Sequence, residues 1–278
     1  MGGLLNGKLS AKELPWVLLI AALGVLIYAH SLPHGFVWDD RVYVFENPLV
    51  NSWAGLRNIW FHNNIEEYYP VTYSCVGLEY KLWGFSTWGF HVISLMLHIL
   101  NALLLFGLLR KWVPRMAGIV ALLFVVHPIQ VETVAWIAER KNLLCFFFFL
   151  LAVHAFLDFE ANGKKRAYAK TLLFFIAALL SKSIAVCFAF VPLIYGWWKR
   201  GSLHKRDFLF ASPLFLIGGM ASIFHLYLMN TYTISPQIPT PSLNLIEKMA
   251  DAGRIFFFYI HQIILPRNFM IFYPKWIN

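Results

Sequence analysis

Two adjacent carboxylates, Asp39 and Asp40, follow the first long apolar run of the chain within eight residues. A carboxylate can accept a proton from a substrate or bind a cation. Neighbouring side chains diverge by about 100° on a helix and by more on a strand, so these two are not expected to act as equivalent ligands of one ion. We expect one of them to point into a cavity. The simpler alternative is a solvated acidic turn after a membrane segment.

A second group of polar residues lies between His127 and Lys141. If this stretch forms a short helix outside the membrane, Glu132, Trp136 and Arg140 lie at positions i, i+4 and i+8 and share one face. That face would hold a carboxylate and a guanidinium about 12 Å apart, with an indole between them. The alternative is an amphipathic connector whose Glu132 and Arg140 are solvated.

Two further cations lie at the ends of apolar runs. Lys182 is flanked by Ser181 and Ser183, and a lysine at membrane depth suggests function, with an anion as its natural ligand. The alternative is a lysine that extends to the lipid headgroups. Arg254, at the outer start of the last apolar run, would either add a second positive charge or anchor that segment at the interface.

The composition excludes a water-soluble globule. Of the 278 residues, 59% are apolar and only 13% are charged, about half the charged fraction of a soluble protein. The formal charge of +9 could suggest nucleic acid. We expect no nucleic-acid partner, because the basic residues form short clusters between long apolar runs, the pattern that orients membrane proteins. Three cysteines are too few for a disulfide framework.

The apolar runs predict an all-α, polytopic transmembrane bundle with about eight membrane segments. Backbone groups in lipid must be paired within the segment, and no regular alternation suggests a barrel. We expect one domain over residues 1–278, with outer loops at 33–89 and 230–253. The predicted segments are 15–32, 90–109, 116–127, 143–159, 168–180, 184–198, 208–229 and 255–265.

Basic clusters predict the orientation of these segments, since Lys and Arg favour the cytoplasmic side. All four clusters fit on one side, and ten of the 14 acidic residues then fall on the other. The clusters are Lys8 and Lys12; Arg110, Lys111 and Arg115; Lys164, Lys165, Arg166 and Lys170; and Lys199, Arg200, Lys205 and Arg206.

The region 171–198 has two interpretations. One is a single long helix with Lys182 near its centre, which would place two basic clusters on opposite sides of the membrane. We prefer a hairpin that turns at Ser181, Lys182 and Ser183. Its first arm of 13 residues rises only about 20 Å, so Lys182 stops below the outer surface, as does His127. Such groups are tolerated at depth beside a water-filled cavity, which predicts a cavity open to the outside.

Several motifs together resemble the membrane domain of tetratricopeptide-repeat proteins related to the transmembrane O-mannosyltransferases, which belong to the GT-C class of glycosyltransferases. The resemblance runs from about Trp38 to Tyr273, and its most specific part lies between His127 and Lys141. The related proteins are usually longer, so the chain is expected to be a truncated form. The motifs are Trp38-Asp39-Asp40, Asn47-Pro48, Tyr68-Tyr69-Pro70-Val71-Thr72, Leu82-Trp83-Gly84-Phe85, Phe90-His91, His98-Ile99-Leu100-Asn101-Ala102, His127-Pro128-Ile129-Gln130-Val131-Glu132, Trp136, Glu139-Arg140-Lys141 and Leu180-Ser181-Lys182.

The resemblance implies an enzyme that moves a sugar from a polyprenyl-phosphate donor in the membrane to a hydroxyl of a protein or glycan acceptor on the outer face. It implies that Asp39 and Asp40 are catalytic. The expected substrate-binding residues are Glu132, Arg140, Lys141, Lys182, Arg254 and His127, with the cations on the lipid phosphate. No cofactor is certain. A divalent cation is an open alternative, with Asp40 and Glu132 as its ligands.

Two non-catalytic alternatives remain: a binder or carrier of lipid-linked or anionic solutes, and a membrane partner that keeps the family scaffold. In an enzyme, a carboxylate of Asp39 or Asp40 should lie within about 10 to 12 Å of Lys182 and Arg140 across one cavity. The expected location is a bacterial inner membrane, with the endoplasmic reticulum membrane as the alternative.

Overall fold

The computed structural model describes residues 10–61, 68–232, 244–267 and 269–270. These residues form helices and no strands, which confirms the all-α prediction. Lys8 of the first basic cluster and residues 233–243 of the predicted loop 230–253 lie outside the described residues. The described ends of that loop belong to helices, since α13 runs to Tyr232 and α14 begins at Leu245. The elements are α2 (Leu14–Tyr28), η1 (Ala29–Ser31), α3 (Asp40–Val44), α4 (Pro48–Asn51), α5 (Trp53–Phe61), α6 (Pro70–Trp83), α7 (Thr87–Leu109), α8 (Ala117–Val126), α9 (Gln130–Ala135), η2 (Ile137–Glu139), α10 (Arg140–Asn162), α11 (Lys165–Leu179), η3 (Ser183–Phe190), α12 (Val191–Arg200), α13 (Lys205–Tyr232) and α14 (Leu245–Ile264).

All eight predicted membrane segments are helical where they are described, but fewer are long enough to cross a bilayer. Among the described residues, four helical segments have the length and hydropathy of a span: Leu14–Ser31, Thr87–Leu109, Ile137–Asn162 and Lys205–Tyr232. A span needs about 20 residues, and α8 is an apolar helix of only ten. The sequence predicts about eight membrane segments, of which 116–127 and 168–180 are too short to cross, and the corresponding helices α8 and α11 have only ten and 15 residues.

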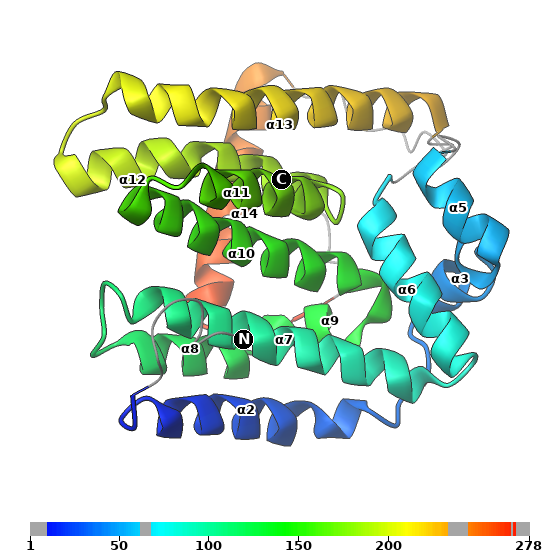
Figure 1. The fold of residues 1–278 in the computed structure, drawn as a ribbon. Coiled ribbons are helices and arrows are strands. Elements are labelled where there is room, and N and C mark those ends of the chain that lie inside the picture. The colour runs from blue at the N-terminus through cyan, green and yellow to red at the C-terminus, as the bar shows by residue number, and fades with distance from the viewer. Residues whose placement is uncertain (1–9, 62–67, 233–243, 268, 271–278) are drawn as a thin grey trace.

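The long helices lie alongside one another, with the smaller helices of the first loop gathered at one end (Figure 1). Helix α10 packs on α7 and α11, while α2 packs on α7 and α8. Helices α3, α5 and α6 form a separate group at the end where α7 and α10 begin. Helix α14 runs across the direction of the long helices. The predicted loop 33–89 is thus largely helical where it is described.

The chain turns back on itself at Lys182, as the hairpin interpretation predicts. Helix α11 ends at Leu179 and η3 begins at Ser183. The rings of Phe175 and Phe188, which lie on opposite arms of the turn, stack with centroids 5.4 Å apart. A single long helix over 171–198 would hold these two rings far apart, so that alternative is wrong.

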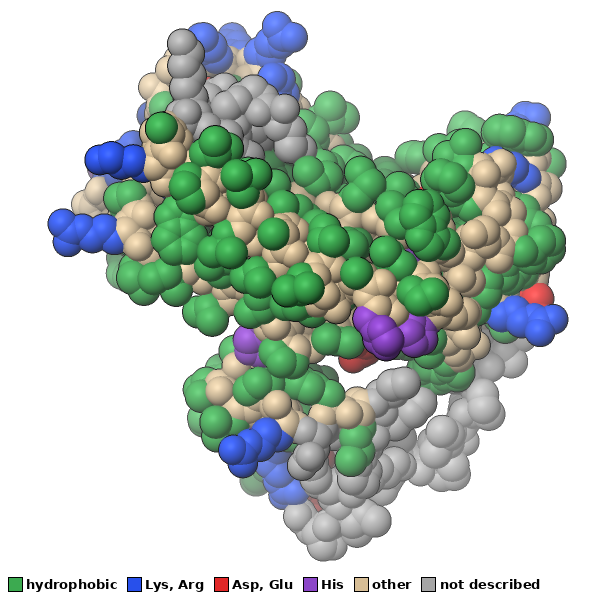
Figure 2. Space-filling view, turned by 90° about the horizontal axis from the view of Figure 1, so that it is seen from below, with side chains coloured by type: hydrophobic (Ala, Val, Ile, Leu, Met, Phe, Trp, Pro, Cys, Tyr) green, Lys and Arg blue, Asp and Glu red, His purple; other side chains and the backbone are tan. Residues whose placement is uncertain are grey.

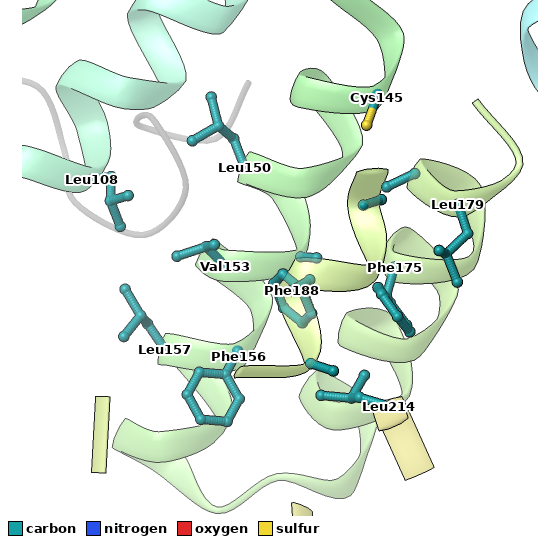
Figure 3. Close-up of a cluster of buried hydrophobic side chains, with 14 of the residues drawn as sticks. Leu108, Cys145, Leu150, Val153, Phe156, Leu157, Phe175, Leu179, Phe188 and Leu214 are labelled. Carbon is teal, nitrogen blue, oxygen red and sulfur yellow. The ribbon is translucent and has the colours of Figure 1, made fainter. Parts of the chain in front are cut away.

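The largest apolar core lies beside this hairpin. Phe156, Phe175, Phe188 and Leu214 are buried where α10, α11, η3 and α13 meet (Figure 3). Phe149 of α10 also packs on this group, with its ring meeting that of Phe188 edge to face at a centroid distance of 5.3 Å. The hairpin is therefore fixed by close packing of large side chains, which holds Lys182 at a defined place.

The basic clusters gather at the opposite end of the bundle from α3, α5 and α6. Arg110 at the end of α7 pairs with Glu13 at the start of α2, at 3.0 Å. Arg206 at the start of α13 pairs with Glu160 near the end of α10, also at 3.0 Å. In the space-filling view, hydrophobic side chains cover the middle of the face, and most Lys and Arg side chains lie at its margins (Figure 2). This is the charge distribution that the predicted orientation requires.

Replacement of Phe188 by Ala should strongly destabilise the hairpin, because this fully buried ring contacts two other rings. We expect a loss of about 3 to 5 kcal/mol in the free energy of unfolding, measured by denaturant titration of the purified protein in detergent. Leu209→Ala on the exposed face of α13 is the matched control. Equal stability of the two variants would contradict this account of the core.

Candidate functional site

The two adjacent carboxylates point in different directions, as their spacing predicts. Asp40 is fully buried. Its Oδ1 accepts the backbone N–H of Ala138 at 2.7 Å, and its Oδ2 accepts that of Val37 at 3.0 Å. Asp39 is exposed, and its Oδ1 accepts the indole N–H of Trp136 at 2.9 Å. Asp40 therefore ties the first loop to η2, and Asp39 is the carboxylate that a substrate can reach.

Burial raises the pKa of Asp40, although the N–H groups of Val37 and Ala138 act in the opposite direction. Burial and hydrogen bonds from backbone N–H groups are both expected of a carboxylate that binds backbone groups in the interior. With each oxygen already engaged by a backbone donor, Asp40 is poorly placed to bind a cation. Among the described residues, no group of three or more His, Cys, Asp or Glu side chains could hold a metal ion.

The residue before Asp39 has an unusual backbone conformation. Trp38 has a φ of +46°, in the left-handed region that a bulky side chain rarely occupies. Its ring stacks on that of Trp136, with centroids 5.4 Å apart and planes inclined by 30°. Such strain costs of order 1 to 3 kcal/mol and persists where the surroundings enforce it. The stacked indoles therefore help to set the direction of Asp39.

The predicted shared face of Glu132, Trp136 and Arg140 is wrong. Helix α9 ends at Ala135, and Trp136 has extended backbone, with φ −95° and ψ +117°. Arg140 then begins a different helix, α10. The i, i+4, i+8 rule requires one continuous helix, and the break at Trp136 sends Arg140 into the interior.

Arg140 is fully buried and has protein partners on all three nitrogens. Its Nη1 forms an ion pair with Glu79 of α6. Its Nη2 donates to the backbone oxygen of Phe90 at 2.6 Å, and its Nε donates to Ser94 Oγ at 3.1 Å. The expectation that Arg140 faces a cavity opposite the aspartates is therefore corrected. It joins α6, α7 and α10 instead.

Lys182 belongs to a charged cluster around Glu139. Its Nζ donates to Asn142 Oδ1 at 2.6 Å and lies 3.7 Å from Glu139 Oε2. Lys141 Nζ lies 3.8 Å from the other carboxylate oxygen of Glu139, and Asn142 donates to that carboxylate. Lys182 is thus held among polar side chains, as expected of a functional rather than a lipid-facing lysine. Both ammonium groups therefore lie close to the same carboxylate.

A cavity of about 520 Å³ lies beside these groups, within the range of about 300 to 1,000 Å³ typical of ligand pockets. Glu132 and Trp136 contribute to one wall, and Tyr259 and Gln262 of α14 line it as well. Burial raises the pKa of Glu132, as does nearby Glu139, whereas Lys182 lowers it. The cavity, Asp39 and the Glu139 cluster therefore meet around the segment that connects α9 to α10.

The remaining predicted site residues lie at different places. His127 contacts α14, because its Nε2 lies 2.9 Å from the backbone oxygen of Ile263. Arg254 is about two turns further back on α14, near Asp251 at 3.9 Å. It does not line the cavity beside Glu132. Of the eight predicted residues, Glu132 lines the cavity. Asp39 is joined to the cavity wall through Trp136, and Lys141 and Lys182 both contact Glu139. The structure does not place Arg140 or Arg254 with them as expected.

Three contributors were not predicted from the sequence as site residues. Glu79 is separated from its partner Arg140 by 61 positions, so no local pattern joins them. Glu139 adjoins two cations, which was the available signal. No sequence signal marked Gln262 as a site residue, because an isolated Gln in a largely apolar run looks like a surface residue.

Comparison with known proteins decides the family. Residues 70–225 match the model of the dolichyl-phosphate-mannose-protein mannosyltransferase family, which covers more than half of the chain. The chain belongs to this family. The resemblance inferred from the motifs is thereby confirmed, and the family is one of glycosyltransferases.

Relatives of this mannosyltransferase family member come from animals. Human protein O-mannosyl-transferase TMTC4 is 28% identical over 197 residues, covering 61% of this chain and 27% of its own length. Tmtc1 of Drosophila melanogaster is 29% identical over 197 residues, covering 66% and 23%. Mouse TMTC1 is 33% identical over 213 residues, covering 68% and 22%. The chain spans about a quarter of the length of these relatives. No solved structure matches it.

These relatives give no support to the bacterial inner membrane as the location. The four candidate spans and the family together indicate a multi-pass membrane protein.

Removal of either partner of the buried ion pair should destabilise this family member more than removal of both. Glu79→Gln leaves the Arg140 guanidinium buried without its counter-charge, and we expect a loss of about 3 to 5 kcal/mol. The double variant Glu79→Leu with Arg140→Met removes both charges and should recover much of that loss. A double-mutant cycle on the free energy of unfolding measures the coupling. Additive losses would contradict the pairing.

The stability of the protein should carry a pH-dependent contribution from Asp40. Because its folded-state pKa is raised above the ordinary 3.8, the native state binds more protons, and this contribution is lost as pH rises through the raised pKa. Relative to Asp40→Asn, the wild type should therefore gain stability as pH falls toward 4. Free energies of unfolding between about pH 4 and 6 test this, and parallel curves would contradict it.

Proposed function

We propose that this chain carries the transfer site of a glycosyltransferase that moves a sugar from a polyprenyl-phosphate donor to a hydroxyl acceptor. One observation carries the proposal: an exposed carboxylate accepts a hydrogen bond from an indole that lines a cavity, and Glu132 of the same cavity interacts with Lys182. The indole of Trp136 both lines that cavity and donates to Asp39. The family description, which names dolichyl phosphate mannose, supports this donor class.

Asp39 is the general base in this proposal. As the acceptor oxygen attacks the anomeric carbon, its proton passes to the Asp39 carboxylate. The bond between that carbon and the phosphate oxygen breaks, and the phosphate leaves with the electron pair. Asp40 is a positioning residue, because both of its oxygens hold backbone N–H groups.

Lys182 and Lys141 stabilise the leaving phosphate. Their ammonium groups flank Glu139 at 3.7 and 3.8 Å, which gathers two cationic groups at one place. Fixed positive charge near the leaving group lowers the barrier when negative charge develops there. A lysine suits this role as a point charge. The acceptor hydroxyl is on a protein in this proposal, in line with the names of the relatives, and Glu132 helps to orient it.

The transfer side is the outer one in this proposal. The Lys and Arg clusters at the opposite end favour the cytoplasm, so Asp39 and Lys182 face the lumen. The animal relatives favour the endoplasmic reticulum membrane. The expected divalent cation has no donor set among the described residues and is not part of the proposal.

A non-catalytic binder of lipid-linked or anionic solutes is the second candidate. It is favoured by the positions of Arg140 and Arg254, two expected phosphate ligands that lie away from the cavity. A binder needs the cavity and Lys182 but has no use for an oriented base. Asp39 therefore separates the two functions.

Asp39→Asn should lower the rate of sugar transfer by about a hundredfold to ten-thousandfold, because the amide cannot accept the proton. The measurement follows labelled mannose from dolichyl phosphate mannose to a peptide rich in Ser and Thr, with the full chain purified in lipid vesicles. Glu46→Gln, at an exposed carboxylate of the same loop, is the control and should transfer normally. Unchanged transfer in Asp39→Asn, or none in the wild type, would overturn the enzymatic proposal.

A further inference from the structure

Gln262 is an unusual residue of α14. Most large side chains of this helix are exposed, yet Gln262 is only 6% exposed and its Oε1 has no hydrogen-bond partner. A buried polar atom without a partner is costly, and such an atom in a native structure calls for an explanation. Gln262 lines the cavity of about 520 Å³. A side chain whose acceptor lacks a partner thus belongs to the wall of a space that a ligand can fill.

The other polar groups of the cavity define what that ligand must offer. Glu132 adds a carboxylate, Tyr259 adds a phenol, and Trp136 adds an aromatic surface. A carboxamide, a carboxylate and a phenol beside an indole suit a ligand that carries several hydroxyl groups on an apolar ring. Val37, Ile129 and Met270 make the remaining wall apolar.

We infer that this cavity binds the hexosyl group of the lipid-linked donor, with Gln262 accepting a hydrogen bond from one of its hydroxyls. The inference rests on the proposed function and adds residues of α14 to the site. It divides recognition of the donor into two parts. Gln262 contacts the sugar, while Lys182 and Lys141 contact the phosphate.

His127 fixes the position of Gln262. Its Nδ1 lies 3.2 Å from the backbone N–H of Ile129, which must donate to it. The proton of the neutral ring therefore sits on Nε2, which donates to the backbone oxygen of Ile263 at 2.9 Å. Because Ile263 follows Gln262 directly, this bond joins α14 to the turn between α8 and α9. His127 is thus a positioning residue rather than a substrate ligand.

The test compares two lipids that differ only in the sugar. Binding of dolichyl phosphate mannose and of dolichyl phosphate is measured on the full chain in lipid nanodiscs. The wild type should prefer the mannosyl lipid. Gln262→Met keeps the side-chain volume but removes the acceptor, so its affinity for dolichyl phosphate mannose should fall about tenfold. Its affinity for dolichyl phosphate should not change.

Three further variants make the result specific. His261→Ala, at an exposed neighbour of Gln262, should bind both lipids normally. His127→Ala should lose preference for the mannosyl lipid, as Gln262→Met does. Lys182→Met should lower the affinity for both lipids by a similar factor.

The outcomes separate the inference from the proposed function. Equal affinity of the wild type for both lipids, or equal weakening of both by Gln262→Met, would overturn the inference. A preserved mannose preference without any transfer would overturn the enzymatic function and leave the sugar site standing. If Gln262→Met lowers the unfolding midpoint, Tyr259→Phe is used as a second variant. A full preference of Tyr259→Phe for the mannosyl lipid would count against the inference.

Discussion

The site depends on one buried ion pair, between Arg140 at the start of α10 and Glu79 of α6. Transfer of either charge out of water costs several kcal/mol unless a partner and hydrogen bonds compensate. Arg140 meets that condition through Glu79, Ser94 and the backbone oxygen of Phe90. These groups come from α6 and α7. The first turn of α10 is therefore fixed relative to both helices.

The neighbours of Arg140 along the chain inherit this constraint. Because consecutive side chains on a helix diverge by about 100°, burial of Arg140 directs Glu139 and Lys141 to other sides. There Glu139 lies 3.7 Å from Lys182 of the α11–η3 turn, and Lys141 lies 3.8 Å from Glu139. One residue further back, the N–H of Ala138 holds Asp40. A single buried guanidinium thus sets the positions of the lysine cluster and of the aspartate loop.

The sequence predicted those parts of the protein that depend on local patterns. Apolar runs located the helices, and the length of the region around Lys182, together with the basic clusters on either side, predicted the hairpin. The angle between adjacent residues predicted that Asp39 and Asp40 separate. The arrangement around Arg140 could not be predicted in this way. It depends on a partner 61 residues away and on a helix break at Trp136, which carries no Pro or Gly to mark it. Gln262 was missed for a similar reason, since the cavity that it lines is completed by residues far earlier in the chain, such as Glu132 and Trp136.

Glu139 has a consequence for any anion that binds at Lys182. A phosphate must compete with a carboxylate already 3.7 Å from the ammonium, so part of its attraction offsets the loss of that contact. Full pairing of the lysines with phosphate alone would hold the released lipid phosphate tightly and slow its departure. The carboxylate of Glu139 weakens the binding of substrate and of product to a similar degree, while the positive charge of the lysines stays in place. Competition between Glu139 and phosphate for the two ammonium groups therefore suits repeated binding and release better than permanent retention.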